Sequence, residues 1–143
     1  MKALFVIGQV LAGLYFINGG INHLTKLEAM TGYAKYKKLP AAKLGVILSG
    51  LVMIAGGLFI LLGYLADLGA IALAVFLVLA AIIFHNFWTV EDATAKMGEM
   101  INFTKNIGLA ALLLMVAALA SLAAKHGLDI GIVVSKAHAV LWK

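Results

Sequence analysis

The sequence contains no cysteine and no arginine, only one proline, and few charged residues. The missing cysteine excludes disulfides, thiolate metal sites and dithiol redox chemistry in this chain. The missing arginine argues against nucleic-acid binding despite the net charge of +5, because bidentate contacts to bases and phosphates depend on the guanidinium group. Charged residues make up 12% of the 143 residues and hydrophobic residues 64%. Soluble domains carry about 25% charged residues, so this composition argues against a water-soluble monomer.

Four long hydrophobic runs dominate the sequence instead. Each is close to the roughly 20 residues that a helix needs to cross a hydrocarbon core about 30 Å thick. The four expected membrane spans cover residues 3–22, 43–65, 68–90 and 101–124. Residues 44–90 carry one formal charge, Asp67, which is well placed in the turn to cap the third helix. We therefore predict an all-α, multi-pass membrane protein of the cell membrane, most simply the prokaryotic inner membrane.

The domain organisation follows from these runs. Residues 1–124 form one integral membrane, antiparallel four-helix bundle, and residues 125–143 form a tail at the interface or against a partner. Small residues spaced along the first two spans predict close helix packing. They are Gly8, Ala12 and Gly19 in the first span, and Gly50 with Gly57 and Gly56 with Gly63 in the second.

The segments between the spans also carry patterns. Leu27, Met30 and Ala34 recur at helical spacing, which predicts a short helix on the membrane surface. Asp92 and Lys96 form an i,i+4 pair, which favours a third helix that continues out of the bilayer. In the tail, residues 130–134 are β-rich, and the chain ends in Trp142 and Lys143.

Lysine counts predict the orientation. Seven lysines lie on the side of the first and third loops and four on the other: Lys26, Lys35, Lys37, Lys38, Lys43, Lys96 and Lys105 against Lys2, Lys125, Lys136 and Lys143. The positive-inside rule then places the first side in the cytoplasm and both termini outside. We read the first-loop lysines as a solvated face that meets anionic lipid.

Unusual polar residues gather at one end of the expected bundle. An antiparallel arrangement brings the ends of the first and third spans beside the start of the fourth, and polar side chains in a bilayer face the bundle interior or a cavity. The candidate pocket comprises Tyr15, Asn18, Asn22, His23, His85, Asn86, Trp88, Glu99, Asn102, Lys105 and Asn106.

Several of these residues have a plainer interpretation. The asparagines can form interhelical hydrogen bonds, the histidines can be interfacial, and Trp88 can be a membrane-interface anchor. No spacing typical of a metal or haem site is present, so we expect no metal and no covalently bound cofactor. A quinone head group is the better candidate, because the combination supplies hydrogen-bond donors, aromatic walls and a histidine that titrates near neutral pH.

The chain resembles the DoxX family of small four-span membrane proteins from about Phe5 to Leu119. The resemblance rests on Gly13-Leu14-Tyr15-Phe16-Ile17-Asn18-Gly19-Gly20-Ile21-Asn22-His23, Leu39-Pro40-Ala41, Gly56-Gly57-Leu58, Phe84-His85-Asn86-Phe87-Trp88 and Asn102-Phe103-Thr104-Lys105-Asn106-Ile107. Similar family members include a small subunit of thiosulfate:quinone oxidoreductase. The resemblance implies a link to membrane redox complexes, and the residues it carries over are His85, Asn86, Trp88, Lys105 and Asn106.

Two functions follow as hypotheses. The favoured one is a small accessory or anchoring subunit of a larger respiratory or redox complex, without chemistry of its own. The alternative is a quinone-binding redox subunit, a quinone-linked oxidoreductase component in which the polar pocket holds the quinone. The expected partners are the lipid bilayer and a larger membrane protein complex or further copies of the chain, and no nucleic acid.

Overall fold

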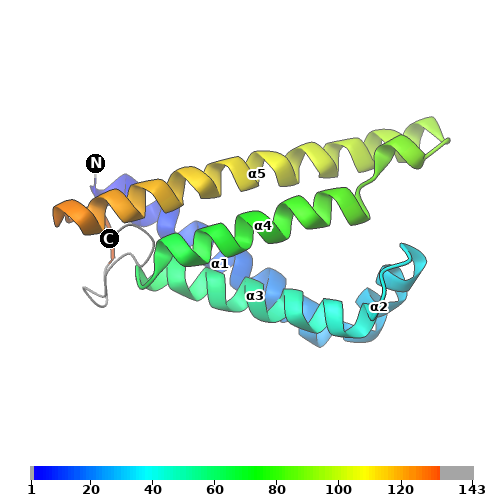
Figure 1. Ribbon diagram of the computed structural model, residues 1–143, viewed down its shortest axis with the longest axis horizontal. Helices are drawn as coiled ribbons and strands as arrows, with labels where there is room; N and C mark the ends of the chain where they lie inside the picture. Colours follow the sequence, from blue (N-terminus) through cyan, green and yellow to red (C-terminus); the bar gives the residue numbers. More distant parts are fainter. Residues whose placement is uncertain (1, 133–143) are drawn as a thin grey trace.

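The computed structural model describes residues 2–132, which form five α-helices and one 3₁₀ helix (Figure 1). The elements are α1 (Lys2–Thr25), α2 (Leu27–Tyr36), α3 (Ala42–Leu62), α4 (Ala66–Phe84), the 3₁₀ helix η1 (Phe87–Thr89) and α5 (Ala93–His126). The segments that contain α1, α3, α4 and α5 are long and apolar enough to cross a membrane. The predicted all-α class and four spans are therefore confirmed.

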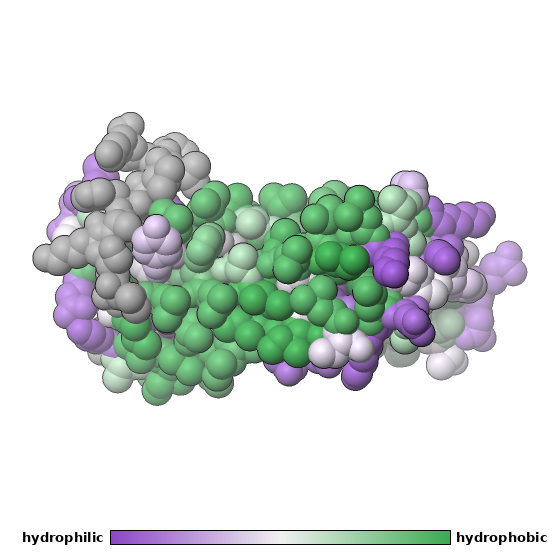
Figure 2. Space-filling model, turned by 90° about the horizontal axis from the view of Figure 1, so that it is seen from below, coloured by the Kyte–Doolittle hydropathy of each residue, from purple (hydrophilic) through white to green (hydrophobic). Residues whose placement is uncertain are grey.

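The long helices pack in the order α1, α3, α4, α5, so that α3 lies between α1 and α4. Their shared core includes Phe16, Met53, Ile60, Leu73, Leu77 and Leu113. Seen in Figure 2, a broad apolar band covers the middle of the molecule, and hydrophilic residues gather toward its ends. This surface is the one expected of helices that face lipid.

Glycines bring α1 and α3 into close contact, partly at positions of α1 other than the predicted ones. A Cβ added at Gly57 would lie 2.8 Å from the carbonyl oxygen of Gly13, and one added at Gly20 would lie 2.5 Å from that of Gly50. Gly8, by contrast, has no neighbour within 4 Å. The predicted Gly50–Gly57 spacing in α3 is confirmed, and it meets Gly13 and Gly20 of α1. Of the other predicted positions, Gly19 faces Met53 of α3, whereas Gly56 faces Gly69 and Leu73 of α4.

The turn between α3 and α4 places Asp67 differently from the prediction. Gly63 ends α3 with a φ of +62°, and Leu65 precedes the first turn of α4. Asp67 is not the N-cap: it lies inside the first turn and is 1% exposed. Its carboxylate accepts hydrogen bonds from the Leu68 amide at 2.8 Å and from the Ser121 hydroxyl of α5 at 3.1 Å. The carboxylate thus joins α4 to α5 instead of capping a helix.

The predicted surface helix is present as α2. Ala34 and Thr31 are buried on its inner face, and Ala34 packs with Ala42 and Val46 of α3. In Figure 1, α2 lies at the N-terminal end of α3 and runs at a steep angle to the α3 axis. As an amphipathic helix in this position, α2 packs against the start of α3 and the end of α1.

The third and fourth spans meet the surface differently from the prediction. α4 ends at Phe84, and Asp92 is the N-cap of α5, where its carboxylate accepts from the Ala95 amide at 2.7 Å. The extension of the third helix through Asp92 and Lys96 is therefore wrong, because both residues belong to the start of α5. With 34 residues, α5 is about 51 Å long, so it extends well beyond a core about 30 Å thick.

The tail is described only as far as Ile132. Residues 127–132 follow α5 without a strand, so the described part of the β-rich stretch has no β-structure. The rest of that stretch, together with Trp142 and Lys143, lies outside the described residues.

Candidate functional site

Glu99 of α5 is the centre of a partly buried cluster of charged and polar side chains. One carboxylate oxygen lies 2.8 Å from Nδ1 of His85, and the other lies 3.3 Å from Nζ of Lys37. Lys37 also donates to the side-chain oxygen of Asn86 at 3.3 Å. The side chains of Lys37 and Glu99 are only 11% and 22% exposed. We call these four residues, Lys37, His85, Asn86 and Glu99, the Glu99 cluster.

Three separate elements position the Glu99 cluster. Lys37 directly follows α2, His85 and Asn86 directly follow α4, and Glu99 lies in the second turn of α5. No glycine or proline stops α4 at this point. Instead, the helix ends where His85 and Asn86 make their side-chain contacts with Glu99 and Lys37. The cluster therefore ties the surface helix to the polar ends of α4 and α5.

Glu99 lies outside the charge-free part of α5. Residues 106–124 carry no charge, and at 1.5 Å per residue they span about 28 Å. Partial burial would raise the pKa of Glu99, but hydrogen bonds from His85 and Lys37 and the charge of Lys37 outweigh it, so this pKa lies below the ordinary value. The carboxylate is accordingly ionised at neutral pH and able to hold both partners.

Tyr33 supports the cluster from α2. Its ring stacks on Phe84 with centroids 5.8 Å apart, and Lys37 Nζ lies 5.8 Å from the Tyr33 ring centroid. Burial raises the pKa of Tyr33, although nearby Lys37 acts in the opposite direction. The phenol therefore keeps its proton and donates to the Phe84 carbonyl at 3.4 Å.

An aromatic group lies next to the cluster. Phe87 and Trp88 of η1 pack edge-on against each other and against Phe103 of α5, with ring centroids 5.3–5.7 Å apart. Trp88 remains 53% exposed. These rings give the site a half-open apolar wall beside its charges.

The structure brings together three of the predicted pocket residues, His85, Asn86 and Glu99. The others lie outside the Glu99 cluster. His23 Nδ1 is 2.9 Å from the Ser49 hydroxyl of α3, and Asn102 accepts from Lys105 at 3.0 Å within α5. Among the remaining members, Tyr15, Asn18 and Trp88 are exposed, Asn22 is half-buried and Asn106 is buried.

The sequence pattern did not predict that Lys37 belongs to the site, because the first-loop lysines were assigned to a solvated face. A signal for its partial burial was present, because Lys37 follows one turn after Tyr33 at the end of an amphipathic segment. What the sequence could not show is that α2 turns this end toward α5.

A cavity of about 780 Å³ lies at the opposite end of the molecule from the Glu99 cluster. It lies between α1, α5 and residues 127–132. The buried side chain of Gln9 lines it, donating to the carbonyls of Ile60 and Ile132 and accepting from the Ile132 amide, at 2.8–2.9 Å. Among residues 2–132, no three His, Asp or Glu side chains come close enough together to hold a metal ion.

Four apolar spanning helices, a surface helix and a charged cluster at one end define a small multi-pass membrane protein. The chain matches the DoxX family over residues 4–86, more than half of its length, and it belongs to that family. No curated protein and no solved structure matches it. The family match includes Lys37, His85 and Asn86, and it ends before Glu99 and the carried-over residues Trp88, Lys105 and Asn106.

Proposed function

We propose that this protein is a small accessory or anchoring subunit of a larger respiratory or redox complex in the prokaryotic inner membrane, without chemistry of its own. The observation that carries the proposal is the pairing of Glu99. One of its oxygens is paired with Lys37 and the other with His85. Polar side chains that satisfy one another between helices hold a membrane bundle together. A structural role for the polar end therefore accounts for its most distinctive residues.

The surface is compatible with this role. α1 and α5 carry exposed faces with large apolar side chains, among them Leu11, Leu14, Leu112, Leu114, Met115 and Leu122. Such faces fit either lipid or the spanning helices of a partner. A small bundle with apolar sides can therefore occupy the space between larger subunits.

The test is the composition of the native particle. The tagged protein is extracted from its own membranes in a mild detergent, the particle is sized, and its proteins and small molecules are identified by mass spectrometry. We expect it to co-purify with haem, flavin or iron–sulfur subunits at fixed stoichiometry. A particle that contains this chain alone would overturn the proposal.

The second candidate is the quinone-binding redox subunit. The observation that favours it is the aromatic group beside His85, whose Trp88 offers an exposed ring next to a titratable side chain. In this case the Glu99 carboxylate would orient the imidazole, and His85 would move a proton to or from the bound quinone.

His85→Gln tests the second candidate. Glutamine keeps a hydrogen-bond donor for Glu99 but cannot titrate, so we expect quinone-linked activity of the purified particle to fall about tenfold or more while its composition stays the same. His126→Gln is the matched control, since it makes the same substitution at an exposed histidine at the opposite end of α5. Unchanged activity in an intact His85→Gln particle would exclude a proton-transfer role for His85.

A further inference from the structure

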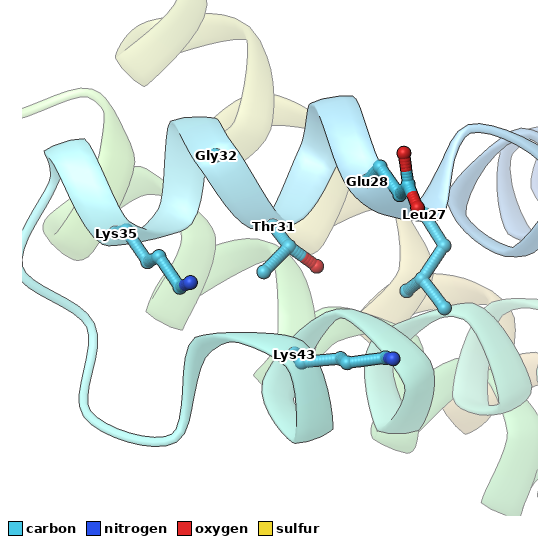
Figure 3. A pocket seen from close by; sticks show the side chains of 6 residues that line it. All are labelled: Leu27, Glu28, Thr31, Gly32, Lys35 and Lys43. Atoms are coloured by element: carbon cyan, nitrogen blue, oxygen red, sulfur yellow. The ribbon is translucent and has the colours of Figure 1, made fainter.

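A small pocket lies between α2 and the first turn of α3. Its volume is about 220 Å³, several times the roughly 30 Å³ that one water occupies in the liquid. The lining residues are Leu27, Glu28, Thr31, Gly32, Lys35 and Lys43 (Figure 3). No residue of the Glu99 cluster is among them, so the pocket is a separate feature.

Thr31 gives this pocket an unmet hydrogen bond. The residue is 8% exposed, and its side-chain oxygen has no hydrogen-bond partner among the described residues. Buried polar atoms almost always have partners, because leaving one without a hydrogen bond costs free energy. In Figure 3, the Thr31 side chain points toward α3, into the space between the two helices. The Thr31 hydroxyl would donate a hydrogen bond to a ligand in the pocket.

The charges of the lining indicate the kind of ligand. Figure 3 shows the Thr31 hydroxyl between the ammonium groups of Lys35 and Lys43, whereas the carboxylate of Glu28 lies away from α3. The lining has two cations and one anion, so one positive charge is in excess. Ammonium groups and a hydroxyl donor together match the oxygens of a phosphate group.

We propose that this pocket binds the phosphate of a membrane lipid head group. Lys35 and Lys43 supply the cations and Thr31 the buried donor.

An exposed apolar stripe on α3 favours a lipid over free phosphate as the source. Directly after Lys43, α3 exposes Leu44, Leu48 and Leu51, which are 55%, 52% and 50% exposed. At the spacing i, i+4 and i+7 these leucines form one stripe. Acyl chains attached to a head group in the pocket can lie along this stripe. The site does not depend on the proposed subunit role, because it is complete within this chain.

The binding experiment uses the purified full chain in a non-ionic detergent. Phosphatidylglycerol is titrated, bound lipid is counted by native mass spectrometry, and a second titration uses inorganic phosphate alone. We expect one tightly held phosphatidylglycerol, and about a tenfold loss of its affinity in Lys35→Gln and in Lys43→Gln. Uptake of inorganic phosphate without lysine-dependent uptake of lipid would overturn the assignment to lipid.

Two further variants separate this site from general surface charge. Lys38→Gln removes the same charge from an exposed lysine of the same loop that does not line the pocket, and we expect it to leave the affinity unchanged. Thr31→Val removes the buried hydroxyl while keeping the shape of the side chain. We expect this variant to stay folded, with a higher melting temperature in the absence of lipid and a several-fold weaker affinity. Equal losses in all three lysine variants, or full affinity in Thr31→Val, would overturn the proposal.

Discussion

Lys37 and Glu99 are 62 positions apart in the sequence, yet the Lys37 ammonium nitrogen lies 3.3 Å from a Glu99 carboxylate oxygen. Both side chains are shielded from solvent. The pair joins the end of the surface helix to the fourth spanning helix, across the end of α4. Because the remaining oxygen of Glu99 contacts His85, one carboxylate fixes three segments at the polar end of the bundle.

Glu99→Gln tests how strongly this end is held. The variant removes the charge but keeps the size of the side chain, so a partly buried Lys37 loses its counter-charge. We expect the free energy of unfolding to fall by about 1–3 kcal/mol. The measurement is denaturant unfolding in detergent, with Glu91→Gln as control. Glu91 is exposed near the same end, so that variant should stay within about 0.5 kcal/mol of the wild type.

The pairing of Lys37 with Glu99 can be isolated by a double-mutant cycle. Lys37→Met and Glu99→Gln are measured singly and together. We expect the double variant to lose less stability than the sum of the single variants, with a coupling energy of about 0.5–3 kcal/mol. Strict additivity would show that the two side chains do not stabilise each other.

Stability should depend on pH through Glu99. The pKa of this carboxyl is lower in the folded protein than its ordinary value of 4.5. Its contribution is therefore fully present above about pH 4.5 and is lost as the pH falls through the lower, folded pKa. Melting temperatures of the wild type and Glu99→Gln should differ at pH 5 and converge as the pH falls below 4.5 and through the lower, folded pKa. A difference that grows as the pH falls below 4.5 would contradict this assignment.

The close approach of α1 and α3 predicts a sharp response at Gly57. A Cβ there would lie 2.8 Å from the Gly13 carbonyl oxygen, which is backbone and cannot move aside. We expect Gly57→Ala to destabilise the bundle by about 1–3 kcal/mol. Gly8→Ala is the matched control, because nothing lies within 4 Å of its Cβ position. Equal effects of the two substitutions would mean that the helices are not this close.

Gln9 predicts how the segment after α5 is held. Its amide exchanges two hydrogen bonds with the backbone of Ile132 and donates a third to Ile60. Gln9→Leu should expose the Ile132 amide, with hydrogen exchange faster by about one to two orders of magnitude, since buried hydrogen bonds of this kind are worth about 1–3 kcal/mol.

Lys2→Gln is the control for the Gln9 variant. The Lys2–Asp129 ion pair connects the same two elements, but both of its side chains are more than half exposed. Exposed ion pairs contribute little, so this variant should leave the exchange at Ile132 unchanged. A large effect of Lys2→Gln would assign the attachment to the ion pair instead.

The pattern of apolar runs was sufficient to predict the four spans, and the helical spacing of Leu27, Met30 and Ala34 was sufficient to predict the surface helix. It was less informative at the ends of the helices. Aspartate is a residue type that commonly caps helices, yet Asp67 is buried in the first turn of α4, where its carboxylate accepts a hydrogen bond from Ser121. The predicted polar pocket was partly correct, because the antiparallel order of the spans placed His85 and Glu99 at the same end. Lys37, by contrast, came from a segment interpreted as solvated.

The sequence alone determined that this chain forms spanning helices, because long charge-free runs are stable in lipid only when the backbone satisfies its own hydrogen bonds. It also determined which end of each helix is polar. Only the tertiary structure decided which polar residues meet. The burial of Lys37 depends on α2 turning across the end of α3, and the pairing of Gly13 with Gly57 depends on the rotation of α1 about its axis. Both are set by packing between helices distant in sequence, which the local periodicity of one helix does not contain.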